Sequence, residues 1–364
     1  MSPQNQSDKR PGSPPSASDA GAMVVKKPKS SESKSVMLSK SSVVETGLQK
    51  IPRTSRLEAP IMHLTGGHEG EVLTARFDPS GQHIASAGFD RSIVLWNTYG
   101  DCKSYGVLKG HRGAILEVQF NHDATQLYSA SSDYTIGVWD TTTGELIKRL
   151  KGHSSFVNSV CPQLKFAGDG IIISASDDRT LKMWDLRRKN PVMTLPQEFP
   201  VTSTCFSAAG DMAFVGSIDD TILAYDLRQQ VLAYSLIGHN DTVSGIRLSP
   251  DGATLLSYAM DNTVRIWDVK PFAAGSRCLK TFEGAPHGFE KNLIKPSWSR
   301  DGGMVATGGG DRSVTIWEVA TGRLAYKLPG HKGCVNQVDF HPTEPIILSG
   351  STDRTLFLGE VLPE

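Results

Sequence analysis

The chain has 364 residues, of which 38% are apolar, and its 38 Lys and Arg residues balance 38 Asp and Glu residues. No apolar run is long enough to cross a bilayer and no secretory leader pattern opens the sequence, so we expect neither membrane association nor export. The five cysteines stand singly, without a C-x-x-C spacing, which favours a reducing compartment and argues against a metal site. We therefore expect no cofactor.

Residues 1–58 differ in composition from the rest of the chain. They hold ten Lys and Arg against five Asp and Glu, whereas the remaining 306 residues hold 28 against 33. Because this basic segment is rich in Ser, Pro and Lys and poor in aromatic residues, we expect a disordered tail. Within it, Lys26, Lys27 and Lys29 form a short cluster typical of nuclear-import signals, and a solvated charge run is the alternative.

From residue 59 onward the sequence repeats. Seven times an aspartate is followed, six residues later, by an aromatic residue or its replacement, at Trp96, Trp139, Trp184, Tyr225, Trp267, Trp317 and Gly359. The intervals are 43, 45, 41, 42, 50 and 42 residues, and most repeats carry a Gly-His pair upstream. This period, with alternating strand patterns and tight-turn residues between them, is typical of the four-stranded blades of a WD40 propeller. We predict an all-β, seven-bladed WD40 propeller over residues 59–364.

The two ends of the repeat region are incomplete. The strand pattern at residues 61–65 precedes the first Gly-His pair and has no blade of its own, and the last repeat stops after its third strand. We expect the N-terminal strand to join the last blade and close the ring, which leaves no unpaired terminal blade.

Four residue types recur at fixed spacing in five repeats: a loop histidine, a Ser or Thr, the aspartate and the tryptophan. An indole can only donate and a carboxylate can only accept, whereas a hydroxyl and a neutral imidazole do both, so a chain of hydrogen bonds from Trp through Ser and His to Asp satisfies every member. The expected sets are His68, Ser86, Asp90 and Trp96; His111, Ser129, Asp133 and Trp139; His153, Ser174, Asp178 and Trp184; His239, Ser257, Asp261 and Trp267; and His287, Thr307, Asp311 and Trp317.

The two remaining repeats depart from this pattern. The fourth has lost the histidine, the hydroxyl and the tryptophan together, as a coupled network predicts, and the seventh lacks only the tryptophan. A Ser, a His and an Asp within reach of one another also suggest a hydrolase, but a catalytic site is needed once and this set occurs five times. We interpret it as structural and expect no enzyme activity.

Partner-binding residues are expected on loops. The loops after the outer strands and the turns after the second strands share one face of a propeller, and there Glu71, Phe89, Arg112, Phe156 and Met260 are candidates because aromatic, Met and charged side chains dominate interface hot spots. Packing against a neighbouring loop is the alternative for each.

The long interval of 50 residues contains two insertions. One enlarges the loop at residues 268–278 on the opposite face and carries Phe272 and Arg277; the other extends the first face at residues 288–292 and carries Phe289 and Lys291. Both are candidate docking sites, and tolerated surface drift is the alternative. The acidic ring argues against nucleic-acid binding by the propeller, so we expect RNA contact only indirectly or through the tail.

Beyond the repeat pattern, several stretches closely resemble the WD-repeat proteins of the U5 small nuclear ribonucleoprotein. The resemblance lies in residues 59–72, 86–102, 259–273, 287–302 and 341–351, and in runs such as YGDC, VKPFA and GFEKNL that repeat geometry does not require. It implies a non-catalytic nuclear scaffold of pre-mRNA splicing that binds the large spliceosomal scaffold protein, Prp-eight, and other U5 particle proteins, as a monomer within a large complex. A WD40 substrate receptor of a ubiquitin ligase or a chromatin-complex subunit is the alternative.

Overall fold

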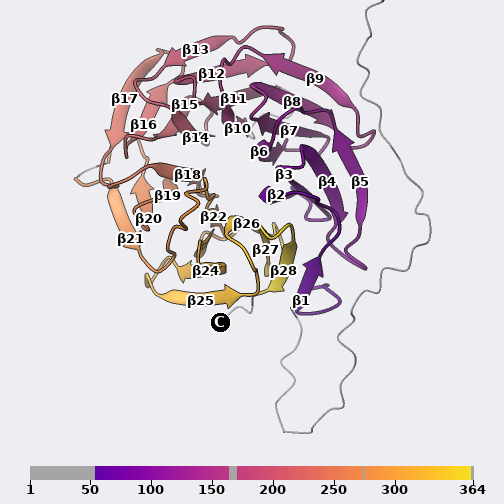
Figure 1. Ribbon diagram of the computed structural model, residues 1–364. Helices are drawn as coiled ribbons and strands as arrows, with labels where there is room; N and C mark the ends of the chain where they lie inside the picture. Colours follow the sequence, from indigo (N-terminus) through magenta and orange to yellow (C-terminus); the bar gives the residue numbers. More distant parts are fainter. Residues whose placement is uncertain (1–53, 164–169, 274, 362–364) are drawn as a thin grey trace, which may run out of the picture.

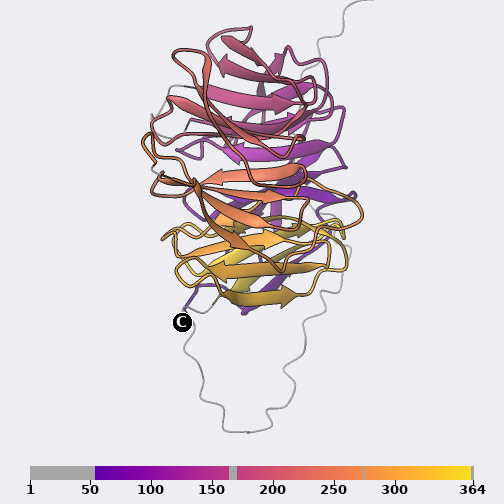
Figure 2. The same cartoon turned by 90° about the vertical axis from the view of Figure 1, so that its left-hand side faces the viewer.

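The computed structural model describes residues 54–163, 170–273 and 275–361, and every regular element within these ranges is a β-strand. Seven four-stranded antiparallel sheets stand around a central axis like the blades of a propeller (Figure 1). We call the strands of each blade a to d, from the centre outward. Seen edge-on, the ring is a disc whose connecting loops gather on two faces (Figure 2). No helix in the described ranges could span a membrane.

The first four blades follow the chain in order. Blade 1 contains β2 (Val72–Phe77), β3 (His83–Gly88), β4 (Ser92–Asn97) and β5 (Ser104–Lys109). Blade 2 contains β6 (Ile115–Phe120), β7 (Gln126–Ser131), β8 (Thr135–Asp140) and β9 (Leu146–Lys151). Blade 3 contains β10 (Val157–Pro162), β11 (Ile171–Ser176), β12 (Thr180–Asp185) and β13 (Met193–Pro196). Blade 4 contains β14 (Val201–Phe206), β15 (Met212–Ser217), β16 (Ile222–Asp226) and β17 (Val231–Leu236).

The last three blades include one with a strand from the start of the chain. Blade 5 contains β18 (Val243–Leu248), β19 (Thr254–Ala259), β20 (Val264–Asp268) and β21 (Cys278–Phe282). Blade 6 contains β22 (Ser297–Trp298), β23 (Met304–Gly308), β24 (Ser313–Glu318) and β25 (Leu324–Pro329). Blade 7 contains β26 (Val335–Phe340), β27 (Ile346–Ser351), β28 (Leu356–Glu360) and, as its outer strand, β1 (Ile61–Leu64).

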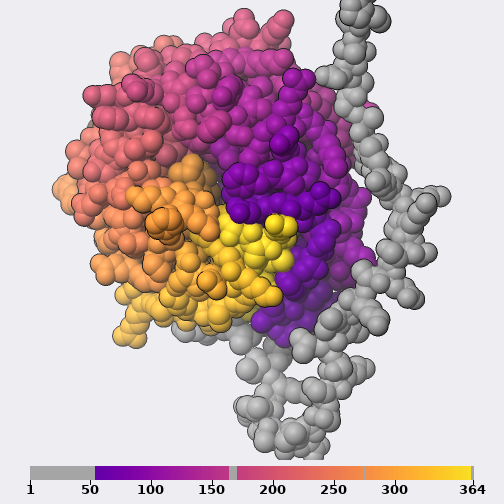
Figure 3. Space-filling view, in the orientation of Figure 1, coloured from indigo at the N-terminus to yellow at the C-terminus, as the bar shows by residue number. Residues whose placement is uncertain are grey.

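The ring closes as the sequence predicts. Strand β1 pairs antiparallel with β28, with Ile61 opposite Gly359 and Leu64 opposite Leu356. In the space-filling view the yellow C-terminal part of the described chain lies directly against its indigo N-terminal part (Figure 3). Every blade is therefore complete, and no sheet is left with a missing outer strand.

Apolar side chains fill the spaces between neighbouring blades. The cluster between blades 1 and 2 combines Ile93 and Leu95 of β4 with Val118 of β6 and Trp139 of β8, all nearly inaccessible to solvent. The same arrangement recurs around the ring, because each sheet turns one face to each neighbour and alternate residues of its strands point to opposite faces. The core is thus a series of inter-blade layers rather than one central mass.

The start of the ring lies slightly earlier than residue 59. The backbone N–H groups of Thr54 and Ser55 donate to the Glu360 carboxylate, at 2.8 and 2.9 Å. Arg56 pairs with Glu344, and Leu57 is buried in the cluster between blades 1 and 7. The expected tail boundary at residue 58 is therefore wrong for residues 54–58, because a single apolar anchor and its flanking polar contacts carry no repeat signal. The candidate import residues Lys26, Lys27 and Lys29 lie outside the described residues.

Charged side chains occupy the centre of the ring. Arg76 of β2 pairs with Asp339 of β26 at 3.0 Å, and the Lys295 ammonium lies 3.8 Å from Glu117 of β6. Lys295 also donates to the Thr202 carbonyl on β14, and all four charged groups are almost fully buried. Burial lowers the pKa of Lys295 even though Glu117 opposes that shift. Buried charges are tolerated only when they are paired, so these contacts tie together inner strands from opposite sides of the ring.

We predict that Leu57 contributes to ring stability. The substitution Leu57→Ala removes a buried side chain and should lower the free energy of unfolding by about 2 kcal/mol or more, as for other Leu→Ala changes in cores. Ile61→Ala is the matched control, because the Ile61 side chain is 67% exposed. Chemical denaturation of both variants measures the difference. Equal stabilities would show that residues 54–58 only rest on the ring.

Candidate protein-interaction face

One face of the ring carries the loop histidines. We call it the histidine face, and it consists of the d–a loops, which connect one blade to the next, and the b–c turns. The d–a loops are residues 65–71, 110–114, 152–156, 197–200, 237–242, 283–296 and 330–334, and the b–c turns are residues 89–91, 132–134, 177–179, 218–221, 260–263, 309–312 and 352–355.

The first blade shows how the repeated residues hold this face. The Trp96 indole donates to Ser86 Oγ at 2.8 Å, and Ser86 Oγ lies 2.6 Å from His68 Nε2. The opposite imidazole nitrogen, His68 Nδ1, lies 2.7 Å from Asp90 Oδ2. With Nδ1 protonated and Nε2 accepting from the hydroxyl, each donor in the chain meets an acceptor. The d–a loop is thereby tied to strands b and c and to the b–c turn.

Blades 2, 3 and 5 repeat this geometry closely. In these blades the Trp–Ser distances are 2.7–2.8 Å, the Ser–His distances 2.6–2.7 Å and the His–Asp distances 2.8–3.0 Å. The bonded sets are His111, Ser129, Asp133 and Trp139; His153, Ser174, Asp178 and Trp184; and His239, Ser257, Asp261 and Trp267.

The aspartate of each network also fixes the backbone on both sides. Asp90 accepts from the Glu69 N–H in the d–a loop and from the Ser92 N–H after the b–c turn. Burial raises the pKa of the Asp90 carboxyl, but the hydrogen bonds from His68 and Ser92 outweigh burial and leave that pKa below its ordinary value. The same balance lowers the pKa of Asp133, Asp178, Asp261 and Asp353.

These networks do not fit a serine hydrolase. The hydroxyl of Ser86 is completely buried and already accepts the Trp96 indole N–H. A nucleophile must reach its substrate, so a hydroxyl sealed between strands has no access to one. The repeated Ser, His and Asp residues position the loops of the histidine face.

The sixth blade departs from the expected network. The His287 ring nitrogens are buried without a hydrogen-bond partner among the described residues, and the ring stacks on Tyr258 at 5.0 Å. The Trp317 indole donates instead to the Glu283 carbonyl, and Asp311 pairs with Lys327 at 2.7 Å. The expected set of His287, Thr307, Asp311 and Trp317 is thus wrong. The physical cause is the longer d–a loop, which is held to blade 5 by the bond from the His287 N–H to Asn262 and turns the imidazole away from Asp311.

Blades 4 and 7 have substitutes for the missing members. In blade 4 the Tyr225 hydroxyl donates directly to Gln197 at 2.9 Å, so two residues span the path that four span elsewhere. In blade 7 His331 keeps its bonds to Ser349 and Asp353, and the Phe357 ring packs edge-on against the imidazole at 4.7 Å. Phe357 thereby takes the space next to the histidine that tryptophan fills in the regular blades.

The histidine face exposes a ring of large apolar side chains. Phe89, at the b–c turn of blade 1, is 55% exposed, and Phe289, in the extended d–a loop of blade 6, is fully exposed. Apolar groups presented in this number on loops are typical of interaction sites rather than of chance exposure. The exposed apolar residues of this face are Phe89, Tyr134, Phe156, Phe199, Ile218, Ile237 and Phe289.

The other candidates of this face differ in accessibility. Glu71 and Arg112 lie exposed beside the networks of blades 1 and 2, and Lys291 is exposed next to Phe289. Met260 is half-buried, and its backbone N–H is bound to the Thr242 carbonyl. The structure thus brings all of them to one face, with Met260 contributing the least surface.

The two candidates on the opposite face, Phe272 and Arg277, differ in their contacts. Phe272 is almost fully exposed on the enlarged c–d loop of blade 5. The Arg277 guanidinium lies 3.8 Å from the centre of the Tyr234 ring and donates to the carbonyls of Asp268 and Lys270. Arg277 therefore shapes this loop, and Phe272 alone of the two is presented to solvent.

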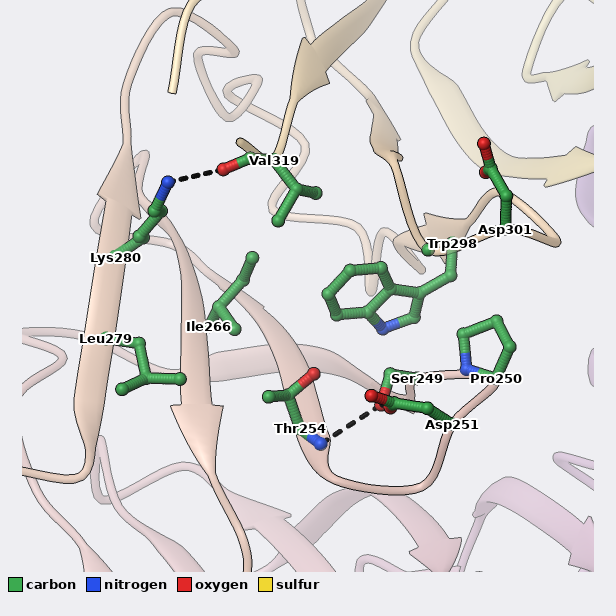
Figure 4. Close-up of a pocket in the computed structure, with 11 residues that line it drawn as sticks. Ser249, Pro250, Asp251, Thr254, Ile266, Leu279, Lys280, Trp298, Asp301 and Val319 are labelled. Carbon is green, nitrogen blue, oxygen red and sulfur yellow. Dashed lines mark hydrogen bonds between the residues drawn. The ribbon is translucent and has the colours of Figure 1, made fainter. Parts of the chain in front are cut away.

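A small crevice of about 280 Å³ lies on that opposite face between blades 5 and 6 (Figure 4). Its polar groups are already engaged, because Ser249 donates to Asp251 and Lys280 donates to the Val319 carbonyl. Trp298, which the strand register predicts as a core residue, is 8% exposed and donates to the Arg247 carbonyl. The crevice is smaller than most ligand pockets and offers few unpaired polar groups.

Sequence comparison with known proteins identifies the family of this chain. A family model described as WD domain, G-beta repeat matches residues 59–97, 102–140, 144–185, 230–268, 276–318 and 322–358. The chain is 52% identical over 310 residues to the U5 small nuclear ribonucleoprotein 40 kDa protein of Homo sapiens, covering 85% of this chain and 86% of the relative. The chain belongs to this WD-repeat family.

Two other relatives are somewhat less similar to the chain. The U5 small nuclear ribonucleoprotein 40 kDa protein of Dictyostelium discoideum is 49% identical, with 85% of this chain and 87% of the relative covered. The pre-mRNA-splicing factor cwf17 of Schizosaccharomyces pombe is 45% identical, with 90% and 95% covered. The family model does not match residues 186–229, and these residues include Gln197 and Tyr225, which replace the network in blade 4.

Several residues of the face were not identified by sequence reasoning. Tyr134, Phe199, Ile218 and Ile237 are exposed there, whereas the predicted candidates include only Phe89, Phe156 and Phe289 among the exposed apolar residues of this face. A rule that selects every large apolar residue within two positions of the aspartate or in a d–a loop would have found them.

No group of three or more His, Cys, Asp or Glu residues in the described ranges could hold a metal ion.

We predict that the network stabilises regular blades and not blade 6. Ser129→Ala leaves the Trp139 indole and the His111 imidazole without their shared partner, so the free energy of unfolding should fall by about 2 kcal/mol or more. Thr307→Val is the matched control in blade 6, because the Thr307 hydroxyl bonds only to the neighbouring Gly308 carbonyl. Denaturant midpoints compare the two. A larger loss for Thr307→Val would contradict the assignment.

The buried His287 should make stability depend on pH. Burial lowers its pKa from 6.5 to about 4, although Asp241 opposes the shift. The folded state therefore binds fewer protons than the unfolded state, so this contribution is complete above pH 6.5 and is lost as the pH falls toward 4.

The variant His287→Phe keeps a ring against Tyr258 but does not titrate. Between the two pH values it should lose less stability than the unmodified chain, by about 3 kcal/mol. Denaturation series across this range measure the difference, and the carboxylates common to both proteins cancel. Parallel stability curves would exclude a buried neutral imidazole.

Proposed function

We propose that this chain is a non-catalytic scaffold subunit of the U5 small nuclear ribonucleoprotein that acts in pre-mRNA splicing. The observation that carries the proposal is the 52% identity over 310 residues to proteins named for that particle. That match covers 85% of this chain, and a relative named as a pre-mRNA-splicing factor is 45% identical over 328 residues. The particle works on nuclear transcripts, so we place the chain in the nucleus.

The partners that we propose are proteins, and the docking surface is the histidine face. Its exposed apolar side chains come from loops fixed by hydrogen-bonded networks, so little ordering entropy is lost when a partner binds them. Aromatic anchors of this kind supply most of the binding energy in known interfaces. We infer that the large spliceosomal scaffold protein, with other U5 particle proteins, covers this face while the chain itself remains a single copy in the complex.

The site chemistry supports a scaffold rather than an enzyme. The Ser, His and Asp residues that resemble a catalytic set are hydrogen-bonded to one another within the buried networks. In the crevice between blades 5 and 6, Ser249 and Lys280 already donate hydrogen bonds to neighbouring residues. Reactive groups usually interrupt a repeat, whereas here they form it. A ubiquitin-ligase receptor or chromatin subunit would use the same fold, but the relatives' names favour splicing.

The proposal predicts that tagged chain expressed in cells recovers U5 RNA together with the large scaffold protein. Phe289→Asp should reduce that recovery strongly, because placing a charge at a hot spot costs about 2 kcal/mol or more, roughly thirty-fold in affinity. Phe272→Asp is the matched control, since its side chain is similarly exposed but lies on the opposite face.

Melting temperatures of both variants should remain unchanged, because neither side chain is buried. Recovery of a cullin adaptor without U5 RNA would contradict the splicing assignment. Loss of recovery with Phe272→Asp and not with Phe289→Asp would place the interface on the opposite face.

A further inference from the structure

A second surface feature borders the apolar ring of the histidine face and shares Tyr134 with it. A groove of about 1010 Å³ begins at the loops around Gly110 and Tyr134, follows β9 on the outer wall of blade 2 and reaches Lys189 beyond β12. It thus runs from the histidine face toward the opposite face, beside blade 3. Its lining includes Arg112, Arg149, Lys151 and Lys189.

The groove is basic although the ring as a whole is acidic. Among the described residues, four Lys and Arg side chains line it against one carboxylate, that of Asp133. That carboxylate is already engaged, because it accepts from His111, from the Arg112 backbone N–H and from Thr135. The described lining is therefore positive, whereas the average charge of the ring sequence is negative.

Two of the cations are available to a ligand. Lys151 and Lys189 are exposed, and neither forms an ion pair within the described residues. The neighbouring Lys148 is not available in this way, because its ammonium donates hydrogen bonds to the carbonyls of Leu186 and Arg188. The bonds of Lys148 fix the loop that carries Lys189, and Lys151 is the last residue of strand β9. Both exposed ammonium groups therefore extend into solvent from fixed backbone positions.

Aromatic rings stand at the entrance of the groove. Tyr134 lines it and lies with its ring centre 5.8 Å from that of Phe156, and each side chain is 45% exposed. Tyr134 occupies the left-handed position of the b–c turn, with φ of 69°, which directs it outward next to the bound Asp133. Exposed ring faces beside a row of cations are the combination that binds single-stranded nucleic acids, because bases stack on the rings while the cations follow the phosphates.

We propose that this groove binds single-stranded RNA, through phosphate contacts of Lys151 and Lys189 and base stacking on Tyr134. An acidic peptide would use the cations but gain little from the rings, so the combination favours RNA. The proposal departs from the expectation that RNA reaches this chain only indirectly or through the tail. It rests on the groove and not on the assignment to U5 particles, so either can fail without the other.

The test is binding of the full chain to a labelled oligouridine RNA of about twelve nucleotides, measured by fluorescence anisotropy over a salt series. The double variant Lys151→Ala/Lys189→Ala should bind about ten-fold more weakly at low salt, and its slope of log affinity against log salt should flatten by about 1.4. The matched control is Lys103→Ala/Lys270→Ala, which removes two exposed lysines from loops of the opposite face and should leave both quantities unchanged.

The variant Tyr134→Asn separates stacking from charge. Asn occupies the same turn position in blade 5 at Asn262, with φ of 65°, so the backbone should tolerate it. Affinity should fall about five-fold or more while the salt slope stays unchanged. Unchanged binding by the double variant would assign RNA contact to the tail and overturn the proposal, as would tighter binding of a polyglutamate peptide than of the RNA.

Discussion

The structure depends on one chain of hydrogen bonds, from a buried tryptophan through a serine and a histidine to an aspartate. In blade 1 these bonds join Trp96 of β4, Ser86 of β3, His68 of the d–a loop and Asp90 of the b–c turn. Each polar group is buried or nearly so, and leaving one unpaired costs more than a single bond gains. The sequence of a blade is therefore constrained as a unit. Blade 4 illustrates this, because Tyr225 and Gln197 replaced the whole path rather than one member.

The same bonds prepare the functional surface. Since the aspartate also accepts backbone N–H groups of the d–a loop and of the residue after the turn, the loops on both sides of it are held in place. Side chains next to these fixed points, such as Phe89 beside Asp90 and Tyr134 beside Asp133, cannot turn inward and remain exposed. A rigid face with fixed apolar anchors suits a scaffold subunit. In blade 6, where the network is absent, the longer loop that carries Phe289 is instead held by the contact of His287 with Asn262.

Periodic features could be predicted from the sequence, and features that occur once could not. The fold, the ring closure by β1 and four of the five complete networks follow from residue spacing, because each blade packs against its neighbours in the same way and repeats the same residues at the same positions. The blade 6 network failed since an insertion changes the direction of the His287 side chain while its spacing remains plausible. Leu57 and the central contacts of Lys295 with Glu117 join residues far apart in the chain, and no local pattern records them. The basic groove was hidden because the summed charge of the ring averages Lys151 and Lys189 with distant carboxylates.

The most direct test of the central claim, that the networks present the histidine face to protein partners, is hydrogen exchange measured by mass spectrometry on the chain alone and within the purified U5 particle. We predict that exchange slows on assembly in loops of the histidine face, above all residues 286–292, 89–91 and 154–156, while the c–d loops of the opposite face exchange as in the free chain. Slower exchange at residues 269–273 and 275–277 and none on the histidine face would contradict the claim.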